Sequence, residues 1–333
     1  MTGPMTGPMS TGTYLGLDVG GTKIAALATD ADGRVLGERI APVDGAPLEQ
    51  RIVTIARQLL DELPDGPPLC AVGVAVPGQV DPALGTLRLA VNLEARDLAI
   101  GPLVSAALGA PCFVEHDARA VAAWLHATDE GRRGLAYLSI GTGISAGIVV
   151  DGALVRGEDG LAGEIGHLVA DPAGPACPCG LRGCLEAVAS GPAIAASAAA
   201  AMRTGAASDL PAHPTTADVF AAARGGDTLA QRVVSDAAAH IARAVRGLVL
   251  AFGVQRVVVG GGVTRAGDAF MQPVLQALDG ERMASALVQR AIPRTAVELL
   301  ASERNAGPLG AVAVARIGLG QLRSDERREV GSR

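Results

Sequence analysis

The 333-residue sequence lacks any run of about 18 strongly apolar residues, the length that a membrane-crossing helix needs. Its Ala-rich run at 193–202 is too short and too weakly hydrophobic to form a membrane-crossing helix. A long polar tract is missing as well, and the composition of 49% hydrophobic and 19% charged residues is that of a folded globular protein. These absences exclude a membrane protein and a mostly disordered chain, and the length favours two domains.

The sequence also has no cluster of basic residues. Its 28 basic residues are scattered among 34 acidic ones, for a net charge of -6, so no nucleic-acid-binding face is indicated. The start, MTGPMTGPMS, lacks the basic and apolar regions of a secretion signal, which favours a cytoplasmic protein. We expect residues 1–12 to be a disordered leader and 321–333 a solvated tail.

Cysteine is scarce, and three of the five cysteines are grouped. Cys177, Cys179 and Cys184 follow His167 in the pattern H-x9-C-x-C-x4-C, within a segment rich in Pro and Gly. Three thiolates and an imidazole suit a closed tetrahedral zinc site that would make such a loop rigid. A redox pair or unliganded thiols are the alternatives. The other two cysteines, Cys70 and Cys112, lie in apolar strand-like segments and are expected in the core.

Only one of the basic residues is a lysine, Lys23, which closes the run DVGGTK from Asp18. Strand-like segments flank this run, so the helix that a Walker phosphate loop requires is absent. A glycine turn between strands can still bind phosphate, because the bare backbone N–H groups of Gly20 and Gly21 point into it and the Thr22 hydroxyl adds a donor. Asp18 can reach a Mg²⁺ ion or its water. An ordinary turn with a capping Asp is the alternative.

The chain alternates short strands with helices, which indicates an α/β fold with helices on both faces of a sheet. Residues 13–40 predict three strands separated by glycine turns, and residues 135–157 repeat this pattern, so we expect two related halves. Gly141, Thr142 and Gly143 form the equivalent turn of the second half. Its extension GTGISAG resembles a dinucleotide fingerprint, but strand-like residues follow where that fingerprint needs a helix.

A further glycine run, Gly260 to Gly262, follows the apolar segment RVVV. At Gly261 and Gly262 the bare backbone can approach a purine or a sugar. A plain turn between a strand and a helix is the alternative.

Taken in order, these motifs resemble the ROK family of bacterial sugar kinases and sugar-responsive repressors. The resemblance is carried by DVGGTK, VPG, EHDAR, GTG, GEIGHLVADPAGPACPCGLRGCLEAVASG and VVVGGGV, over about residues 13–320. It implies a two-lobed hexokinase/actin-like (ribonuclease H-like) α/β fold with mixed sheets. We expect an N-terminal lobe over 13–118, completed by a helix over 306–320, and a C-terminal lobe over 119–305 with a zinc-binding loop at 163–186.

The resemblance also implies roles for single residues. Asp117 matches the catalytic aspartate, which takes the proton from the sugar 6-hydroxyl, although a helix N-cap role is open to it as well. The family's sugar-binding positions fall on Gly78, Asn92, His116, Asp117, Glu164, His167 and Glu186. If His167 binds zinc through one ring nitrogen and sugar through the other, the zinc is structural and orients a substrate ligand. Glu164 and Glu186 are otherwise solvated acids.

The implied function is a glucokinase-like transfer of phosphate from ATP, with Mg²⁺, to the 6-hydroxyl of a hexose by a homodimer. Family repressors carry a DNA-binding domain before the first phosphate turn, and only 17 residues precede Asp18, which favours a kinase. The alternatives are an N-acetylmannosamine, other amino-sugar or cyclitol kinase, a sugar-sensing regulator without its own DNA-binding domain, and an actin- or chaperone-like ATPase. Polyphosphate is an alternative donor.

Three departures from the family pattern concern the choice of sugar. His116 stands where these kinases usually have Asn, Arg119 replaces another frequent Asn, and the segment LEARDL after Asn92 lacks the Pro and Trp common in glucokinase-like members. The cysteine-rich segment is particularly similar to that of N-acetylmannosamine kinases. A strict preference for glucose is therefore not expected from the sequence.

Overall fold

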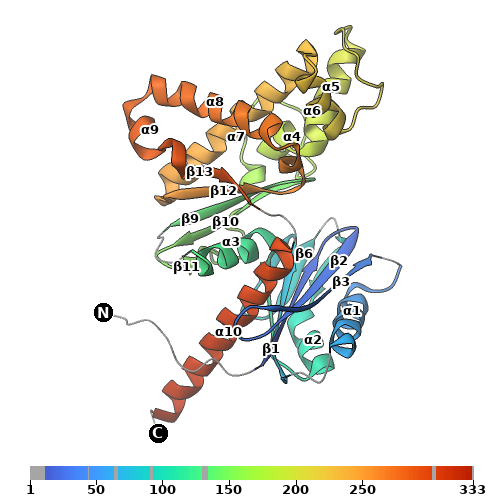
Figure 1. Cartoon of the computed structure of the whole chain (residues 1–333), viewed down its shortest axis with the longest axis vertical. Coiled ribbons are helices and arrows are strands. Elements are labelled where there is room, and N and C mark those ends of the chain that lie inside the picture. Colours follow the sequence, from blue (N-terminus) through green and yellow to red (C-terminus); the bar gives the residue numbers. More distant parts are fainter. Residues whose placement is uncertain are drawn as a thin grey trace. The chain divides into compact units, whose positions relative to one another are not determined.

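The computed structural model describes residues 12–43, 45–63, 67–90, 93–129, 134–301 and 305–331. The chain forms two compact units, each built on a five-stranded mixed sheet (Figure 1). Unit 1 comprises Met1–Glu130, Arg156–Leu161 and Arg304–Arg333. Unit 2 comprises Gly131–Val155 and Ala162–Glu303. This architecture confirms the predicted two-part α/β fold with mixed sheets.

The sheet of unit 1 has the strand order β3-β2-β1-β4-β8. Its strands are β1 (Thr13–Val19), β2 (Lys23–Thr29), β3 (Val35–Pro42), β4 (Leu69–Val76) and β8 (Cys112–His116). The first three form an antiparallel meander around the glycine turns, whereas β4 and β8 run parallel to β1. Parallel strands bring the carboxyl ends of β1 and β8 to the same edge of the sheet.

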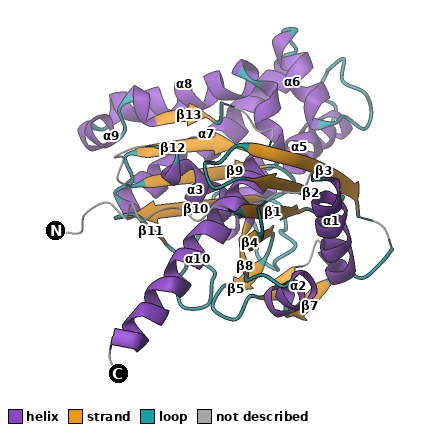
Figure 2. Ribbon diagram, turned by 60° about the horizontal axis from the view of Figure 1, so that its bottom comes forward, coloured by secondary structure: helices purple, strands orange, loops and turns teal. Residues whose placement is uncertain are grey.

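Helices cover both faces of this sheet because the side chains of β1 alternate between two cores. Leu15 and Leu17 pack in the core that includes residues of α1 (Leu48–Glu62) and α2 (Ile100–Leu108). Tyr14 faces the opposite way, toward α10 (Ala306–Gly331). Figure 2 shows α1 beside β2 and β3, and α10 along β1.

A small antiparallel sheet in unit 1 was not expected from the sequence. It has the order β5-β6-β7 and comprises β5 (Gln79–Asp81), β6 (Thr86–Ala90) and β7 (Ala95–Leu98). Val80 and Leu87 join the core beneath α1 and α2, and Arg88 pairs with Asp81 at 2.9 Å. These strands follow directly from Gly78, so they fix the backbone at that glycine.

Helix α10 lies unusually close to the sheet because glycines face it. A Cβ atom added to Gly73 would lie 1.8 Å from the carbonyl oxygen of Ala311, and one added to Gly16 would lie 2.1 Å from that of Pro308. Gly310 on α10 in turn allows close contact with the backbone of Ala120 on α3 (Asp117–Ala127). The C-terminal segment is therefore an integral part of unit 1.

Two boundaries differ from those expected. The prediction divided the lobes between residues 118 and 119, whereas α3 lies wholly in unit 1 because it packs against α10. The segment Arg156–Leu161 also belongs to unit 1, although the expected C-terminal lobe included it. The expected tail at 321–333 continues α10 as far as Gly331, in a stretch rich in Arg, Glu and other residues compatible with a helix. Of the expected leader, residues 1–11 lie outside the described residues.

Unit 2 repeats the sheet of unit 1, with the order β11-β10-β9-β12-β13. Its strands are β9 (Leu135–Ile140), β10 (Ile144–Val150), β11 (Ala153–Leu154), β12 (Arg256–Gly260) and β13 (Val297–Leu299). Again the first three in sequence are antiparallel, and β12 and β13 run parallel to β9. The matching order and directions agree with two related halves.

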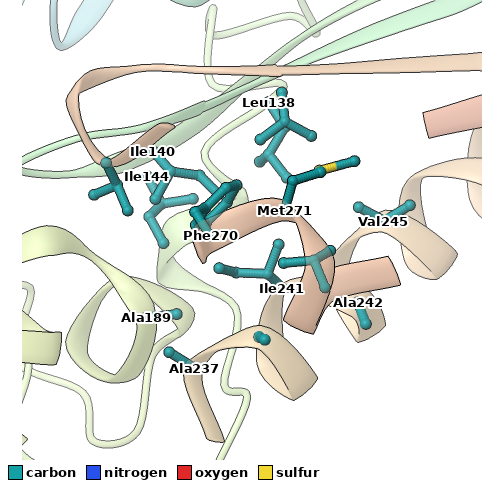
Figure 3. Close-up of a cluster of buried hydrophobic side chains, with 14 of the residues drawn as sticks. Leu138, Ile140, Ile144, Ala189, Ala237, Ile241, Ala242, Val245, Phe270 and Met271 are labelled. Atoms are coloured by element: carbon teal, nitrogen blue, oxygen red, sulfur yellow. The ribbon is translucent and has the colours of Figure 1, made fainter. Parts of the chain in front are cut away.

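The helices of unit 2 are α4 (Leu185–Ala189), α5 (Gly191–Arg203), α6 (Thr216–Arg224), α7 (Thr228–Phe252), α8 (Asp268–Ala284) and α9 (Ala286–Ala291). Short 3₁₀ turns occur at Ile165–His167, Gly262–Ala266 and Arg294–Ala296. Leu138 and Ile140 of the sheet share a core with Ile241 of α7 and Phe270 and Met271 of α8 (Figure 3). Across the described part of the chain, no helix is both long and apolar enough to span a membrane.

Replacing Gly73 tests the close approach of α10. We expect Gly73→Ala to lower the free energy of unfolding by about 3 kcal/mol, because the new methyl group would meet the Ala311 carbonyl. Gly280→Ala in α8 is the matched control, since no atom lies within 4 Å of its added Cβ. That change should stabilise by about 0.5–1 kcal/mol. Urea unfolding measures both, and equal stability of the two variants would contradict the packing described.

Candidate active site

The turn between β1 and β2 presents bare backbone and one hydroxyl. Gly20 N–H donates to the Lys23 carbonyl at 2.9 Å, which closes the hairpin. Val43 N–H donates to the Thr22 carbonyl at 2.9 Å and so ties the turn to the end of β3. Gly21, Thr22 and Lys23 are exposed. The turn is therefore fixed at its base and open at its tip, as a phosphate-binding hairpin requires.

Asp18 is the next-to-last residue of β1 and lies against the first turn of α10. A Cβ atom on Gly307 would lie 2.2 Å from its carboxylate, so only glycine leaves room there. Burial and, to a smaller extent, the neighbouring Asp117 raise the pKa of Asp18 to about 7, although Lys23 opposes both. A carboxylate in this position gains from a cation at its side, which suits the predicted role beside Mg²⁺.

Asp117 is the first residue of α3, at the corner where β8 ends. Its Oδ1 accepts a hydrogen bond from Ala118 N–H at 2.6 Å and lies 3.2 Å from Nδ1 of the buried His116. The N-cap residue of α3 is His116, whose side chain makes no capping hydrogen bond. The alternative prediction, that Asp117 is the N-cap, is therefore wrong. The Asp117 side chain is 38% exposed and can meet a substrate.

Of the two other sugar positions predicted in this part of the sequence, the structure describes Gly78. Gly78 has φ of +100°, and a Cβ atom there would lie 2.3 Å from the Leu89 carbonyl, so the residue must be glycine. Asn92 lies outside the described residues.

In unit 2 the two predicted glycine turns come together at the ends of β9 and β12. Gly141 N–H donates to the Gly143 carbonyl at 2.9 Å. A Cβ atom added to Gly141 would lie 3.7 Å from the backbone nitrogen of Gly262. Gly261 has φ of +96°, and a Cβ there would collide with the Ile140 backbone. Thr142 is exposed at the tip of its turn.

Glu186 lies beside this pair of turns. It sits in the first turn of α4, and its Oε2 accepts a hydrogen bond from Ile144 N–H at 2.9 Å. A Cβ on Gly143 would lie 2.6 Å from the same oxygen. Glu186 thus supports the turn as well as being a predicted sugar ligand. Glu164 is partly buried and directly precedes the 3₁₀ turn that ends at His167.

His167, Cys177, Cys179 and Cys184 converge in unit 2. Their potential ligand atoms all lie within 4.8 Å of one another. Cys179 Sγ is 3.6 Å from Cys184 Sγ, and Cys177 Sγ is 3.7 Å from His167 Nδ1. Ligands about 2.3 Å from a central ion in a tetrahedron are about 3.8 Å apart, so the cluster fits a tetrahedral metal ion.

The backbone holds these ligands in a short loop. Cys177 N–H donates to the Leu181 carbonyl at 2.8 Å, and Gly180 N–H to the Cys177 carbonyl at 3.0 Å. Gly183 has φ of +67° and lies against the Asp171 backbone, which lets the chain return to Cys184. Burial raises the pKa of the Cys184 thiol to about 12, so a metal ion would have to displace that proton.

One charged group near Asp117 was not found from the sequence. Glu115 and Arg119 are fully buried and hydrogen-bond to each other, and Arg156 binds the second oxygen of Glu115. A glutamate within an otherwise apolar strand, four residues before an arginine in an Ala-rich helix, is the signal that could have revealed the pair.

The sequence matches the ROK family over residues 14–317. Over 283 residues it is 33% identical to a glucokinase of Halalkalibacterium halodurans, covering 80% of this chain and 86% of that protein. It is also 33% identical, over 312 residues, to an N-acetylmannosamine kinase of Citrobacter koseri, and the match covers 91% of this chain and 98% of that protein. A ROK family glucokinase from Streptomyces griseus, solved in complex with glucose and AMPPNP, has a TM-score of 0.73 and 28% identity over 92% of this chain and 99% of that one.

These similarities extend through both units, and the motifs described above lie within the matched range. The chain belongs to the ROK family.

Zinc content tests the cysteine cluster. We expect about one zinc ion per purified chain and none in Cys179→Ser, whose melting temperature should also fall, because a four-ligand site loses one ligand. Cys70→Ser is the control, since Cys70 lies outside the cluster and should leave the zinc in place. Elemental analysis and thermal unfolding measure both effects. Unmutated protein without zinc would rule out the metal site.

Asp18→Asn tests the raised pKa of Asp18. The pKa of Asp18 is about 7 in the folded protein, whereas the ordinary pKa of an aspartate, 3.8, applies to the unfolded chain. The stability that the bound proton provides is therefore lost progressively as the pH rises between these two values. The variant should therefore raise the free energy of unfolding by roughly 2 kcal/mol near pH 8 and change it little near pH 4, in the absence of Mg²⁺ and nucleotide. The exposed Asp61→Asn is the control. An effect independent of pH would contradict the raised pKa.

Proposed function

We propose that the protein is an ATP-dependent hexose kinase of glucokinase type, which phosphorylates the 6-hydroxyl of a sugar. One observation carries the proposal: the partly exposed Asp117 lies in the same unit as the phosphate hairpin and is close enough to Asp18 to raise its pKa. This proximity supports Asp117 as the proton acceptor and Asp18 as the carboxylate beside Mg²⁺. Phosphoryl transfer needs this positioning and charge neutralisation more than covalent chemistry.

In this proposal Asp117 accepts the proton of the sugar hydroxyl as the phosphorus–oxygen bond forms. Ala118 N–H and His116 lie at its Oδ1, which leaves Oδ2 as the oxygen for the proton. Asp18 holds the Mg²⁺ that accompanies the nucleotide. Mg²⁺ supplies neutralisation of the phosphate charge when it is bound.

The glycine turns are assigned to the nucleotide. Gly20, Gly21, Thr22 and Lys23 offer donors to phosphate from unit 1, and Gly141, Thr142 and Gly143 offer them from unit 2. Gly261 and Gly262 present bare backbone to the purine or its ribose. ATP as the donor is supported by the Streptomyces griseus relative, which was solved with AMPPNP.

The sugar ligands are assigned to Gly78, Asn92, His116, Glu164, His167 and Glu186, together with Asp117. His167 directs Nδ1 toward the cysteines, which leaves Nε2 for a sugar hydroxyl. Zinc is the proposed metal, held by His167, Cys177, Cys179 and Cys184. Its role would be to fix the orientation and tautomer of His167 rather than to act on the phosphate.

An N-acetylmannosamine or other amino-sugar kinase is the second candidate. The glucokinase and N-acetylmannosamine kinase relatives are equally identical to the chain, and the latter match covers more of it. The buried His116 adds a larger ring than Asn beside Asp117. A sugar-sensing regulator is disfavoured because Asp117 retains an open carboxylate. A homodimer and a cytosolic location, where thiols stay reduced, are further expectations.

Turnover on a panel of sugars tests the proposal. We expect ADP formation from Mg·ATP with one or more of glucose, mannose, glucosamine, N-acetylglucosamine and N-acetylmannosamine. Asp117→Asn should lower kcat by about 10² to 10⁴ and leave sugar binding, measured by calorimetry, within about threefold. Asp268→Asn is the control, because this exposed aspartate also begins a helix.

Near-normal turnover of Asp117→Asn would remove this residue from the proton-accepting role. Binding of a sugar without any ADP formation would favour the sensor instead of the kinase. Turnover confined to N-acetylmannosamine would select the second candidate.

A further inference from the structure

The corner that carries Asp117 contains a buried charge cluster. Glu115, the residue before His116, and Arg119, two residues after Asp117, both have 0% exposure. Glu115 Oε1 accepts hydrogen bonds from Arg119 Nε at 2.7 Å and from His116 N–H at 2.9 Å. The Glu115 side chain therefore ties the end of β8 to the first turn of α3, on either side of Asp117.

The second oxygen of Glu115 is bound by another arginine. Its Oε2 accepts from Arg156 Nε at 2.6 Å. Burial acts to raise the pKa of Glu115, but Arg119 and Arg156, by charge and by hydrogen bonding, outweigh it and hold the pKa below its ordinary value. Glu115 is thus ionised, and both its oxygens are engaged.

Arg156 begins the segment Arg156–Leu161, which the chain inserts into unit 1 between two stretches of unit 2. Three hydrogen bonds fix this segment. Besides the Arg156 bond, Arg119 Nη1 donates to the Gly160 carbonyl at 2.9 Å, and Gln79 Nε2 donates to the Asp159 carbonyl at 3.0 Å. Gly160, with φ of +68°, lies so close to Val80 that a Cβ would be 2.1 Å from its carbonyl oxygen.

Arg119 is the residue common to these contacts. Its Nε donates to Glu115, next to the corner that carries Asp117, and its Nη1 donates to Gly160 in the inserted segment. That segment leads within three residues to Glu164 and then to His167. A buried arginine that joins a carboxylate to a backbone carbonyl fixes both in a single geometry, since its planar group cannot satisfy the two bonds in another orientation.

We propose that Arg119 is a positioning residue for phosphoryl transfer: through Glu115 and Gly160 it holds the Asp117 corner and the inserted segment 156–161 in the arrangement that the reaction uses. The inference rests on the proposed kinase function. Because Arg119 is fully buried, its proposed role is to position other groups rather than to touch substrate or nucleotide. Its loss should therefore lower kcat through misplacement of Asp117, with a smaller effect on the KM for ATP.

Arg119→Met tests the inference, because methionine keeps an unbranched chain and removes both bonds. Arg282→Met is the matched control: Arg282 is also buried, binds Asp279 at 2.6 Å and donates to the Ile292 carbonyl at 2.6 Å, but it lies in unit 2. Both variants should lose melting temperature. At temperatures where each is fully folded, Arg119→Met should lose at least tenfold in kcat, with the KM for ATP within threefold, and Arg282→Met should stay within twofold in both.

A double-mutant cycle distinguishes loss of the Glu115–Arg119 bond from general destabilisation as the cause of a lower kcat. Glu115→Gln alone, Arg119→Met alone and the double variant should share most of one loss in kcat, because either change breaks the same bond. Arg119→Lys should recover part of kcat, since lysine can pair with Glu115 but lacks the second donor direction. Losses in kcat that simply add would overturn the inference.

Hydrogen exchange gives a readout that does not depend on activity. In Arg119→Met, amides of residues 156–161 should exchange at least tenfold faster than in the unmutated protein, and in Arg282→Met they should not change. Turnover by the unmutated protein together with normal kcat and normal exchange in Arg119→Met would overturn the positioning role alone. Absence of turnover in the unmutated protein would overturn the proposed function, and the catalytic part of the inference with it.

Discussion

The burial of Asp18 near a second carboxylate, Asp117, is the main electrostatic constraint at the sheet edge of unit 1. Asp18 is the next-to-last residue of β1, Asp117 follows β8, and the two strands are parallel, so their carboxyl ends lie at the same edge. Burial and, to a smaller extent, repulsion from Asp117 raise the pKa of Asp18 to about 7, and the single lysine of the chain only partly offsets them. Carboxylates perturbed in this way cluster at sites that bind cations or transfer protons, which are the roles proposed for Asp18 and Asp117.

Unit 2 has a sheet of the same topology, but different groups lie at its turns. Its turns at 141–143 and 261–262 place bare backbone together instead of carboxylates. Glu186 then fixes the first turn through Ile144, and Glu186 follows Cys184 by only two residues. The metal-ligand loop and the glycine turn are thus joined through one short helix. Rigidity that a metal gives to the loop would reach the turn by this covalent and hydrogen-bonded path.

Much of this organisation could be predicted from the sequence, and the exceptions have physical reasons. Glycine turns between apolar runs fix the strand pairs, and the His/Cys spacing brings four ligands together. The small sheet was missed because its strands have only three to five residues, and because Glu94 before β7 and Asp97 within β7 have positive φ, where glycine or asparagine is the usual signal. The lobe boundary failed because it depends on α10, which returns from the far end of the chain.

Arg119 was not placed in the core from the sequence, because an arginine among alanines in a helix ordinarily faces solvent and only the glutamate four residues earlier signals a partner. In the structure the positive charge of Arg119 lies near Asp117 and is paired with Glu115. Arg119 lies only two residues from Asp117, and an unpaired guanidinium there would attract the carboxylate that we propose as the proton acceptor. Glu115 holds that charge within a buried hydrogen-bonded pair, so Asp117 keeps its exposed oxygen for the substrate. A buried ion pair of this kind adds little net stability, and its retention is better explained by the single geometry it imposes.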